Sequence, residues 1–280
     1  SGFPSDPGLR VTLLNWQDPP FNRWSFQHLR ELIPTQRIPI GHGLVRPLVR
    51  HETPLDPGAV TVHRVDERVS TLAEVLEETY TDAVVVVHDG RIVLERYSGG
   101  MTAETVHLLM SVTKSVVGCV AGILADRGQL DPDLPVDLYV PEVTGSGYGG
   151  ARVRDLLDMR TGVLFREEYT NPDAEVRVME RHMGWRPGLS PGHIGGMYAF
   201  LASMSAVSHH GGPFVYRSAD TDMLGWVCER AAGVRMADLI STLIWQRMGA
   251  EFEAEITCDG VGSAIHDGGM SATARDIARF

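Results

Sequence analysis

The chain has 280 residues, with 25 Lys and Arg against 36 Asp and Glu, which gives a formal net charge of −11. A hydrophobic content of 43% with 22% charged residues excludes wholesale disorder, and the length allows one large domain or two. The acidic balance argues against a nucleic-acid or anionic-membrane partner, and the apolar runs fall short of the roughly 20 residues of a membrane span.

The N-terminus and the cysteines indicate a cytoplasmic protein. Ser1–Pro4 shows no basic region followed by an apolar one, so we expect no secretory signal. Cys119, Cys228 and Cys258 show no paired spacing, and the first two lie in apolar helical patterns. We therefore expect reduced thiols in the core.

Residues 1 to about 70 are rich in Pro and Arg with little periodicity, so we expect an extended lead-in that wraps a core. A β-hairpin follows, with strands Ala83–Val87 and Arg91–Tyr97 joined by the turn Asp89-Gly90. Helical spacing and capping residues predict helices at Thr71–Tyr80, Ser111–Arg127, Arg152–Met159, Met197–Ser205, Ala219–Ala232, Met236–Met248 and Thr273–Phe280. The Gly- and Pro-rich stretch 182–196 is predicted as an active-site loop, and Glu255–Thr257 as a short strand.

Lys114 is the only lysine among the 25 basic residues. Arg stays protonated, whereas a lysine can lose its proton when it is buried or crowded by cations. Ser111 precedes Lys114 by three residues at the head of the most apolar helix, so both side chains lie on one helix face. This spacing predicts a nucleophilic Ser111 and a neutral Lys114 whose pKa burial lowers. The alternative is a helix-capping serine beside a solvated lysine.

Three further segments carry weaker signals. Tyr216 lies in the run Tyr-Arg-Ser ahead of a helix, where it could transfer protons beside Lys114 or simply pack. Gly268-Gly269 after Asp267 predicts a loop followed by a capped helix. Glu167 and Glu168 are adjacent, and we interpret them as surface carboxylates.

Together these motifs resemble the penicillin-recognising serine hydrolases, which include class C β-lactamases, DD-peptidases and related carboxylesterases. The order is Ser-x-x-Lys, then Tyr-x-Ser about a hundred residues on, then Gly268–Phe280. Val153–Val163 also resembles a family segment, with Arg160 in place of the usual His. The resemblance implies an α/β (α+β) class C β-lactamase-like fold, with an antiparallel sheet flanked by helices and a mostly helical domain.

The same resemblance divides the chain into three regions. Residues 1–110 would form the lead-in and part of the α/β domain, 111–250 the nucleophile helix and helical domain, and 251–280 the return to the α/β domain. The last predicted helix reaches the final residue, and a lone hairpin is marginally stable. We therefore expect further C-terminal strands, together with the family's third motif and second oxyanion donor, beyond residue 280.

A narrower resemblance is to the nylon-oligomer hydrolases, which are cytoplasmic, homodimeric amidases and esterases of 6-aminohexanoate oligomers. It rests on segments such as Trp16–Thr35, Glu167–Pro172 and Tyr216–Thr221. It implies a small-molecule substrate and no cofactor or metal. The alternatives are a promiscuous carboxylesterase, a β-lactamase or D-peptidase, and a non-catalytic binding module of the same fold.

This narrower resemblance also assigns roles to seven residues. Ser111 would be the nucleophile, with Lys114 and Tyr216 as its base and proton relay. The expected substrate-binding residues are Tyr169 for the substrate amide, Trp185 along the cleft, Glu180 for the ammonium end, and Asp267, at a position where relatives carry Asn or His.

Overall fold

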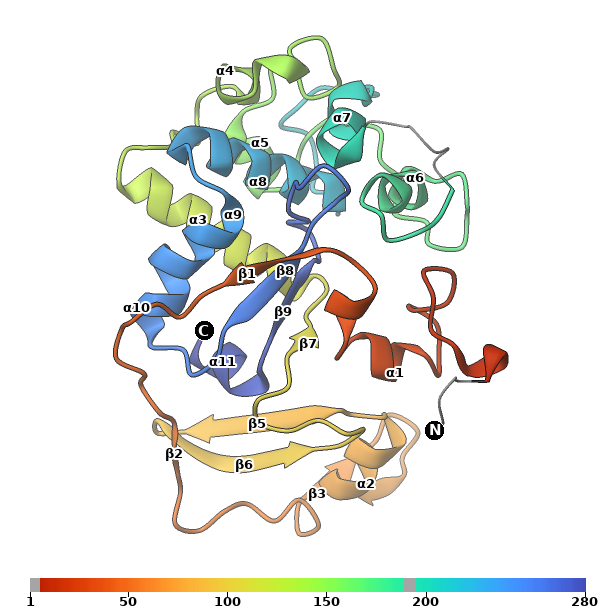
Figure 1. Cartoon of the computed structure of the whole chain (residues 1–280), viewed down its shortest axis with the longest axis vertical. Helices are drawn as coiled ribbons and strands as arrows, with labels where there is room; N and C mark the ends of the chain where they lie inside the picture. Colours follow the sequence, from red (N-terminus) through yellow and green to blue (C-terminus); the bar gives the residue numbers. More distant parts are fainter. Residues whose placement is uncertain (1–5, 189–194) are drawn as a thin grey trace.

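The computed structural model describes residues 6–188 and 195–280. Most helices gather around a small sheet, and a hairpin lies at the other end of the molecule (Figure 1). This mixture of helices with largely antiparallel strands agrees with the predicted α/β (α+β) class. Residues 189–194 of the predicted loop 182–196 lie outside the described residues.

The small sheet supports the start of the Ser111 helix. Its strand order is β1 (Thr35–Ile38), β8 (Ala254–Thr257), β9 (Met270–Ala272) and β7 (His107–Leu108), and every neighbouring pair is antiparallel. The expectation of an extended lead-in was incomplete, because β1 pairs along its whole length with β8. A four-residue strand among prolines gives too short an alternation to be recognised before its partner is known.

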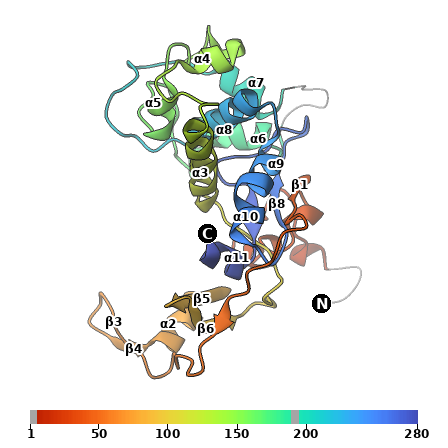
Figure 2. The same ribbon diagram turned by 90° about the vertical axis from the view of Figure 1, so that its left-hand side faces the viewer.

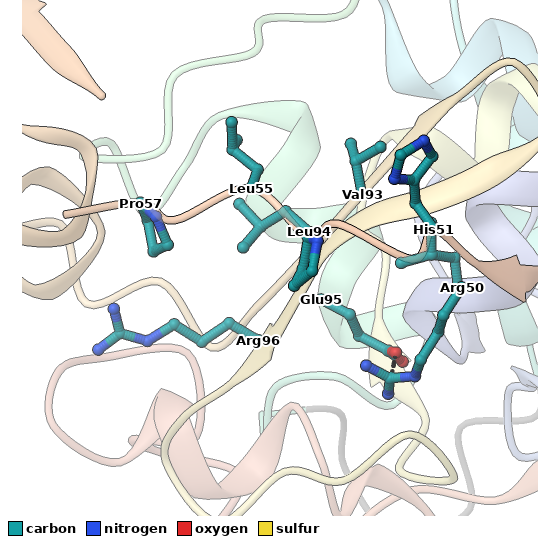
Figure 3. A pocket seen from close by; sticks show the side chains of 10 residues that line it. Arg50, His51, Leu55, Pro57, Val93, Leu94, Glu95 and Arg96 are labelled. Atoms are coloured by element: carbon teal, nitrogen blue, oxygen red, sulfur yellow. Dashed lines mark ion pairs between the residues drawn. The ribbon is translucent and has the colours of Figure 1, made fainter. Parts of the chain in front are cut away.

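The predicted hairpin is confirmed as β5 (Ala83–His88) and β6 (Arg91–Tyr97). Asp89 and Gly90 both have positive φ, as a tight two-residue turn requires. β2 (Val49–Arg50) runs parallel to β6, and Figure 2 shows β3 (Thr61–His63), β4 (Val69–Thr71) and α2 (Leu72–Glu78) beyond the hairpin. A cavity of about 340 Å³ lies beside β2 and β6, where Arg50 pairs with Glu95 (Figure 3).

The helices agree with the predictions except at α1, α4 and α6, which the sequence patterns missed. Their bounds are α1 (Asn22–Ser25), α3 (Val112–Asp126), α4 (Val136–Tyr139), α5 (Val153–Leu157), α6 (Glu175–His182), α7 (Gly196–Ser203), α8 (Ser218–Ala232), α9 (Met236–Ile240), α10 (Gln246–Met248) and α11 (Ala274–Arg279). A wider, π-helical turn at Ser241–Trp245 joins α9 to α10 within the helix predicted as one piece.

The core is centred on α3 and α8, which pack against each other. Val116 and Val120 of α3 are fully buried, and α8 is buried from Ser218 to Cys228. The expectation of a core thiol at Cys119 was wrong, because this residue is exposed on α3. Cys228 and Cys258 are buried, and all three cysteines are free.

Candidate active site

The small sheet fixes Ser111 at the N-cap position, directly before the first residue of α3. The Leu109 amide donates to the Met270 carbonyl at 2.8 Å, and Met270 N–H donates to Thr113 Oγ1 at 3.2 Å. Between these two anchors Met110 has a φ of +47°, a conformation that side chains other than Gly rarely adopt. The chain therefore turns sharply from β7 into α3, and Ser111 lies exposed at the bend.

Lys114 and Tyr216 both reach the Ser111 hydroxyl. Lys114 Nζ lies 3.1 Å from Ser111 Oγ, and the Tyr216 hydroxyl donates to the same oxygen at 2.9 Å. Lys114 Nζ also lies 5.2 Å from the centre of the Tyr216 ring. The structure thus brings together three residues from two helix starts that are 105 positions apart in sequence.

Acidic side chains surround the buried amine of Lys114. The sequence predicted that burial lowers the pKa of this lysine. Burial does lower the pKa of Lys114, but the charges of Asp267 and Asp222 and the interaction with Tyr216 outweigh burial, so the pKa of Lys114 is raised. Lys114 Nζ donates to the Asp267 carbonyl at 2.8 Å and lies 3.8 Å from its carboxylate. The predicted lowering of the Lys114 pKa is wrong, because the fold brings the carboxylates of Asp267 and Asp222 close to a lysine for which the sequence indicates only burial.

Asp267 and Asp222 form a buried acidic pair. Asp222 Oδ1 accepts the backbone N–H groups of His266 at 2.8 Å and Asp267 at 3.0 Å. Burial raises the pKa of both carboxyl groups, and each is raised further by other acids, Asp222 by Asp267 and Asp267 by Glu167. Asp267, predicted as a substrate contact, therefore lies where it acts directly on Lys114.

Glu167 belongs to the same cluster, contrary to the interpretation of a surface carboxylate. Its Oε1 accepts the Tyr169 hydroxyl at 2.6 Å and the Ser218 hydroxyl at 2.7 Å, and its Oε2 accepts the Ser218 amide at 3.1 Å. Ser218 is buried at the start of α8, two residues after Tyr216. The run Tyr216-Arg217-Ser218 was the sequence signal that could have indicated a role for Glu167. It places the hydroxyl of Ser218, to which Glu167 binds, two residues after the predicted site residue Tyr216.

Glu180 lies in a cluster of arginines. It is buried on α6, and its Oε2 pairs at 2.6 Å with both Arg177 and Arg186. Its Oε1 accepts from Gln17 at 3.3 Å. A substrate ammonium group would therefore compete with two guanidinium groups for this carboxylate.

The Trp185 indole is fixed by a hydrogen bond from its nitrogen and by a ring contact with Trp16. Its Nε1 donates to Thr257 Oγ1 at 3.3 Å, and Trp16 meets it edge-on with ring centres 5.4 Å apart. A side-chain carbon placed on Gly268 would lie 3.3 Å from the Trp185 ring. The indole thus packs against the segment that carries Asp267, and a direct contact with substrate stays a prediction.

The chain is similar to known proteins in sequence and in fold. The sequence profile of the beta-lactamase family matches residues 70–280. The chain belongs to the beta-lactamase family. Within this family it is 38% identical over 279 residues to a 6-aminohexanoate-dimer hydrolase from Paenarthrobacter ureafaciens, which covers 99% of this chain and 68% of that protein.

Solved structures with similar folds support this assignment. A structure from Bacillus anthracis described as a candidate 6-aminohexanoate-dimer hydrolase has a TM-score of 0.87 and 27% identity, over 97% of this chain and 70% of that chain. A class C beta-lactamase has a TM-score of 0.55 and 15% identity, over 74% of this chain and 60% of that chain, which supports the fold alone. The class C β-lactamase-like fold and the resemblance to the nylon-oligomer hydrolases are confirmed.

The described parts of the chain contain neither a membrane-spanning helix nor a metal-binding cluster. Across residues 6–188 and 195–280, no helix is both long and apolar enough to cross a membrane. The same residues contain no group of three or more His, Cys, Asp or Glu side chains arranged to hold a metal ion.

Proposed function

We propose that this hydrolase cleaves linear amides of the 6-aminohexanoate type, and short esters, through an acyl-enzyme on Ser111. The observation that carries the proposal is the convergence of Lys114 Nζ and the Tyr216 hydroxyl on Ser111 Oγ, at 3.1 and 2.9 Å. Similarity over nearly the whole chain to a protein named for hydrolysis of the 6-aminohexanoate dimer supports the substrate class.

In the first half-reaction, Ser111 Oγ attacks the carbonyl carbon and its proton passes into the Lys114–Tyr216 pair. That proton then moves to the leaving amine or alcohol as the C–N or C–O bond breaks, which leaves an ester on Ser111. Water repeats the sequence in the second half-reaction and releases the acid. The N–H groups of Val112, Thr113 and Lys114 already donate to backbone carbonyls. The Ser111 N–H would therefore be the donor at the start of α3 that helps to hold the developing oxyanion.

The protonation state of the pair sets the pH dependence. The pair must lose one proton before it can accept that of Ser111, and the raised pKa of Lys114 makes this loss an alkaline event. We therefore expect kcat/KM to rise with pH through the neutral range.

Glu180 favours a second candidate function, that of a carboxylesterase for uncharged substrates. Its Oε2 is already paired at 2.6 Å with Arg177 and Arg186, so little of its charge is available to an ammonium group. An ester without a cationic end needs no such partner.

Three substrates separate these functions: the 6-aminohexanoate linear dimer, 4-nitrophenyl butyrate and a cephalosporin. We expect turnover of the dimer and the ester with a burst of released product, loss of both in Ser111→Ala, and a mass increase on Ser111 with an acylating probe. Turnover of the ester alone would support the carboxylesterase, and an active Ser111→Ala variant would refute the mechanism.

A further inference from the structure

The proposed mechanism does not use the buried His266 imidazole, although the next residue, Asp267, contacts Lys114. The His266 side chain is fully buried, and among the described residues neither of its ring nitrogens has a hydrogen-bond partner. Nδ1 lies 4.0 Å from Asp222 Oδ1, and Nε2 lies 3.8 Å from Glu229 Oε1. The ring therefore lies between two carboxylates of α8.

Helix α8 leaves room for this ring. Asp222, Gly225 and Glu229 are three and four residues apart, so they lie on one side of the helix, and the two carboxylates flank a position that has no side chain. A side-chain carbon on Gly225 would lie 2.1 Å from the His266 ring. The imidazole fills the gap at Gly225, which keeps it beside both carboxylates.

The two oxygens that face the ring are hydrogen-bond acceptors. Asp222 Oδ1 accepts two backbone N–H groups, at 2.8 and 3.0 Å. Glu229 Oε1 accepts the Met236 amide at 2.7 Å, and Glu229 Oε2 accepts the Tyr198 hydroxyl at 2.6 Å. A neutral imidazole would turn a lone pair toward one of the facing oxygens, whereas an imidazolium has an N–H for each. The contacts therefore favour a protonated ring.

The groups around the outer side of the ring keep Glu229 charged. The Tyr198 ring of α7 lies 6.1 Å from the imidazole, and burial raises the pKa of Tyr198, so this neighbour is neutral. Asp259, on the loop after β8, accepts the Met197 amide at 2.7 Å. Burial raises the pKa of Glu229, but the interactions with His266 and Tyr198 outweigh burial, so the pKa of Glu229 is lowered.

A row of alternating charges connects the ring to Lys114. Burial lowers the pKa of Lys114, whereas the charges of Asp267 and Asp222 raise it. The Asp267 carboxylate lies 3.8 Å from Lys114 Nζ, and Asp222 lies between this pair and His266, because it binds the backbone N–H groups of both loop residues. A positive charge on His266 would oppose the effect of the two aspartates on the lysine.

We propose that His266 is a positioning residue whose protonated ring offsets the Asp222 and Asp267 carboxylates and so keeps Lys114 able to release its proton. It would act through Asp222 and not on the substrate. Its role in the reaction rests on the proposed hydrolase function, whereas the charge of the ring can be measured without any substrate.

NMR of the unchanged chain, labelled with ring-¹⁵N histidine, measures that charge. His266 is the one fully buried histidine of the described residues, so its N–H groups are those most protected from exchange with water. We expect both of its nitrogens to carry hydrogen at about pH 8, where exposed histidines are neutral. A ring with one protonated nitrogen at this pH would overturn the inference.

His266→Gln tests the connection to Lys114. Without the positive charge the aspartates act unopposed, so Lys114 holds its proton to a higher pH. We expect the midpoint of the rise of kcat/KM with pH, for 4-nitrophenyl butyrate, to move up by about one pH unit, the scale of one nearby charge. The plateau at high pH should change less than about twofold, since Ser111, Lys114 and Tyr216 are all retained.

His210→Gln is the matched control, because His210 is a partly buried histidine whose Nδ1 accepts the Gly162 amide at 3.0 Å. Its midpoint should equal that of the unchanged chain. If the unchanged chain does not hydrolyse the ester, the proposed function fails. If it does, and His266→Gln lowers the plateau at an unchanged midpoint, His266 has a purely structural role and the inference is overturned.

Discussion

The Lys114 side chain lies between acidic groups on one side and the hydroxyls of Ser111 and Tyr216 on the other. Its Nζ contacts the Ser111 hydroxyl and the Asp267 carbonyl, and the Asp267 carboxylate lies 3.8 Å away. The Lys114 amine therefore interacts both with the buried carboxylate of Asp267 and with the hydroxyl of Ser111. That double contact explains why a lysine, with a compact and removable proton donor, occupies a position in a chain whose other basic residues are Arg.

A charge-preserving change tests this argument. Lys114→Arg keeps the net charge, but a guanidinium is planar and does not release its proton near neutral pH. We expect acylation to fall by at least about 10²-fold, the usual contribution of a positioned acid–base group. The burst of 4-nitrophenol from 4-nitrophenyl butyrate measures this step, and a burst of normal size and rate would show that only the positive charge matters.

At the scale of elements, α8 connects the candidate site to the core through one polar face. Ser218, Asp222, Gly225 and Glu229 are spaced four, three and four residues apart, so they lie along one side of the helix. Asp222 holds the backbone before Gly268, and Glu229 Oε1 lies 3.8 Å from the buried His266 ring. The helix thus fixes the loop that carries Asp267.

Gly225 is the point of closest approach between this helix and that loop. A side-chain carbon at Gly225 would lie 2.1 Å from the His266 ring. We expect Gly225→Ala to destabilise the chain by about 1–3 kcal/mol, the usual cost of overpacking a core. The same change at Gly122 of α3, which meets no atom within 4 Å, should instead stabilise by about 0.5–1 kcal/mol.

Urea denaturation of the two alanine variants measures both effects. Equal stabilities would show that the helix and the loop can separate without cost. A loss of esterase activity in folded Gly225→Ala would in addition show that the displaced loop moves Asp267.

The sequence predicted elements and residues whose signal is local. The hairpin turn and the helix α3 follow from nearby residues, as does the Ser111–Lys114 pair. It did not predict β1, whose partner strand is more than 200 positions away, or the role of Glu167, whose partner Ser218 is 51 positions away. It also gave the wrong direction for the Lys114 pKa, because the nearby carboxylates come from α8 and the loop after β8.

At the scale of the whole molecule, buried polar contacts connect distant segments. Trp16 of the lead-in is buried and donates from Nε1 to the Trp185 carbonyl at 2.8 Å. Asp220 of α8 accepts the Thr161 hydroxyl at 2.7 Å and the Tyr148 hydroxyl at 3.2 Å. These contacts place titratable groups in the interior, so the stability of the whole fold depends on pH.

Asp220 makes that dependence measurable. Burial raises the pKa of Asp220 to about 7, above the value near 3.9 of an unfolded aspartate. Between about pH 4 and pH 7 the folded chain therefore holds a proton that the unfolded chain has released. The contribution of protonated Asp220 to the free energy of unfolding is present at low pH and is lost as the pH rises through 7. The free energy of unfolding falls by up to about 1.4 kcal/mol per pH unit over this range.

Asp220→Asn should flatten this part of the pH profile. The free energy of unfolding in urea, measured from pH 4.5 to 7.5, should fall less steeply with rising pH in the variant than in the unchanged chain. Asp158→Asn, a change at an exposed aspartate, serves as the control. Identical slopes in all three proteins would mean that Asp220 is ionised throughout this range.

The single lysine gives the whole molecule a built-in spectroscopic reporter. Reductive methylation with ¹³C-formaldehyde labels lysine ε-amines and the terminal amine, so this chain would carry one labelled side chain, at Lys114. Because that amine is only 11% exposed, labelling under mildly unfolding conditions followed by refolding would place the probe. Its methyl resonance would then follow the protonation of the candidate site in solution, with no other lysine signal to separate from it.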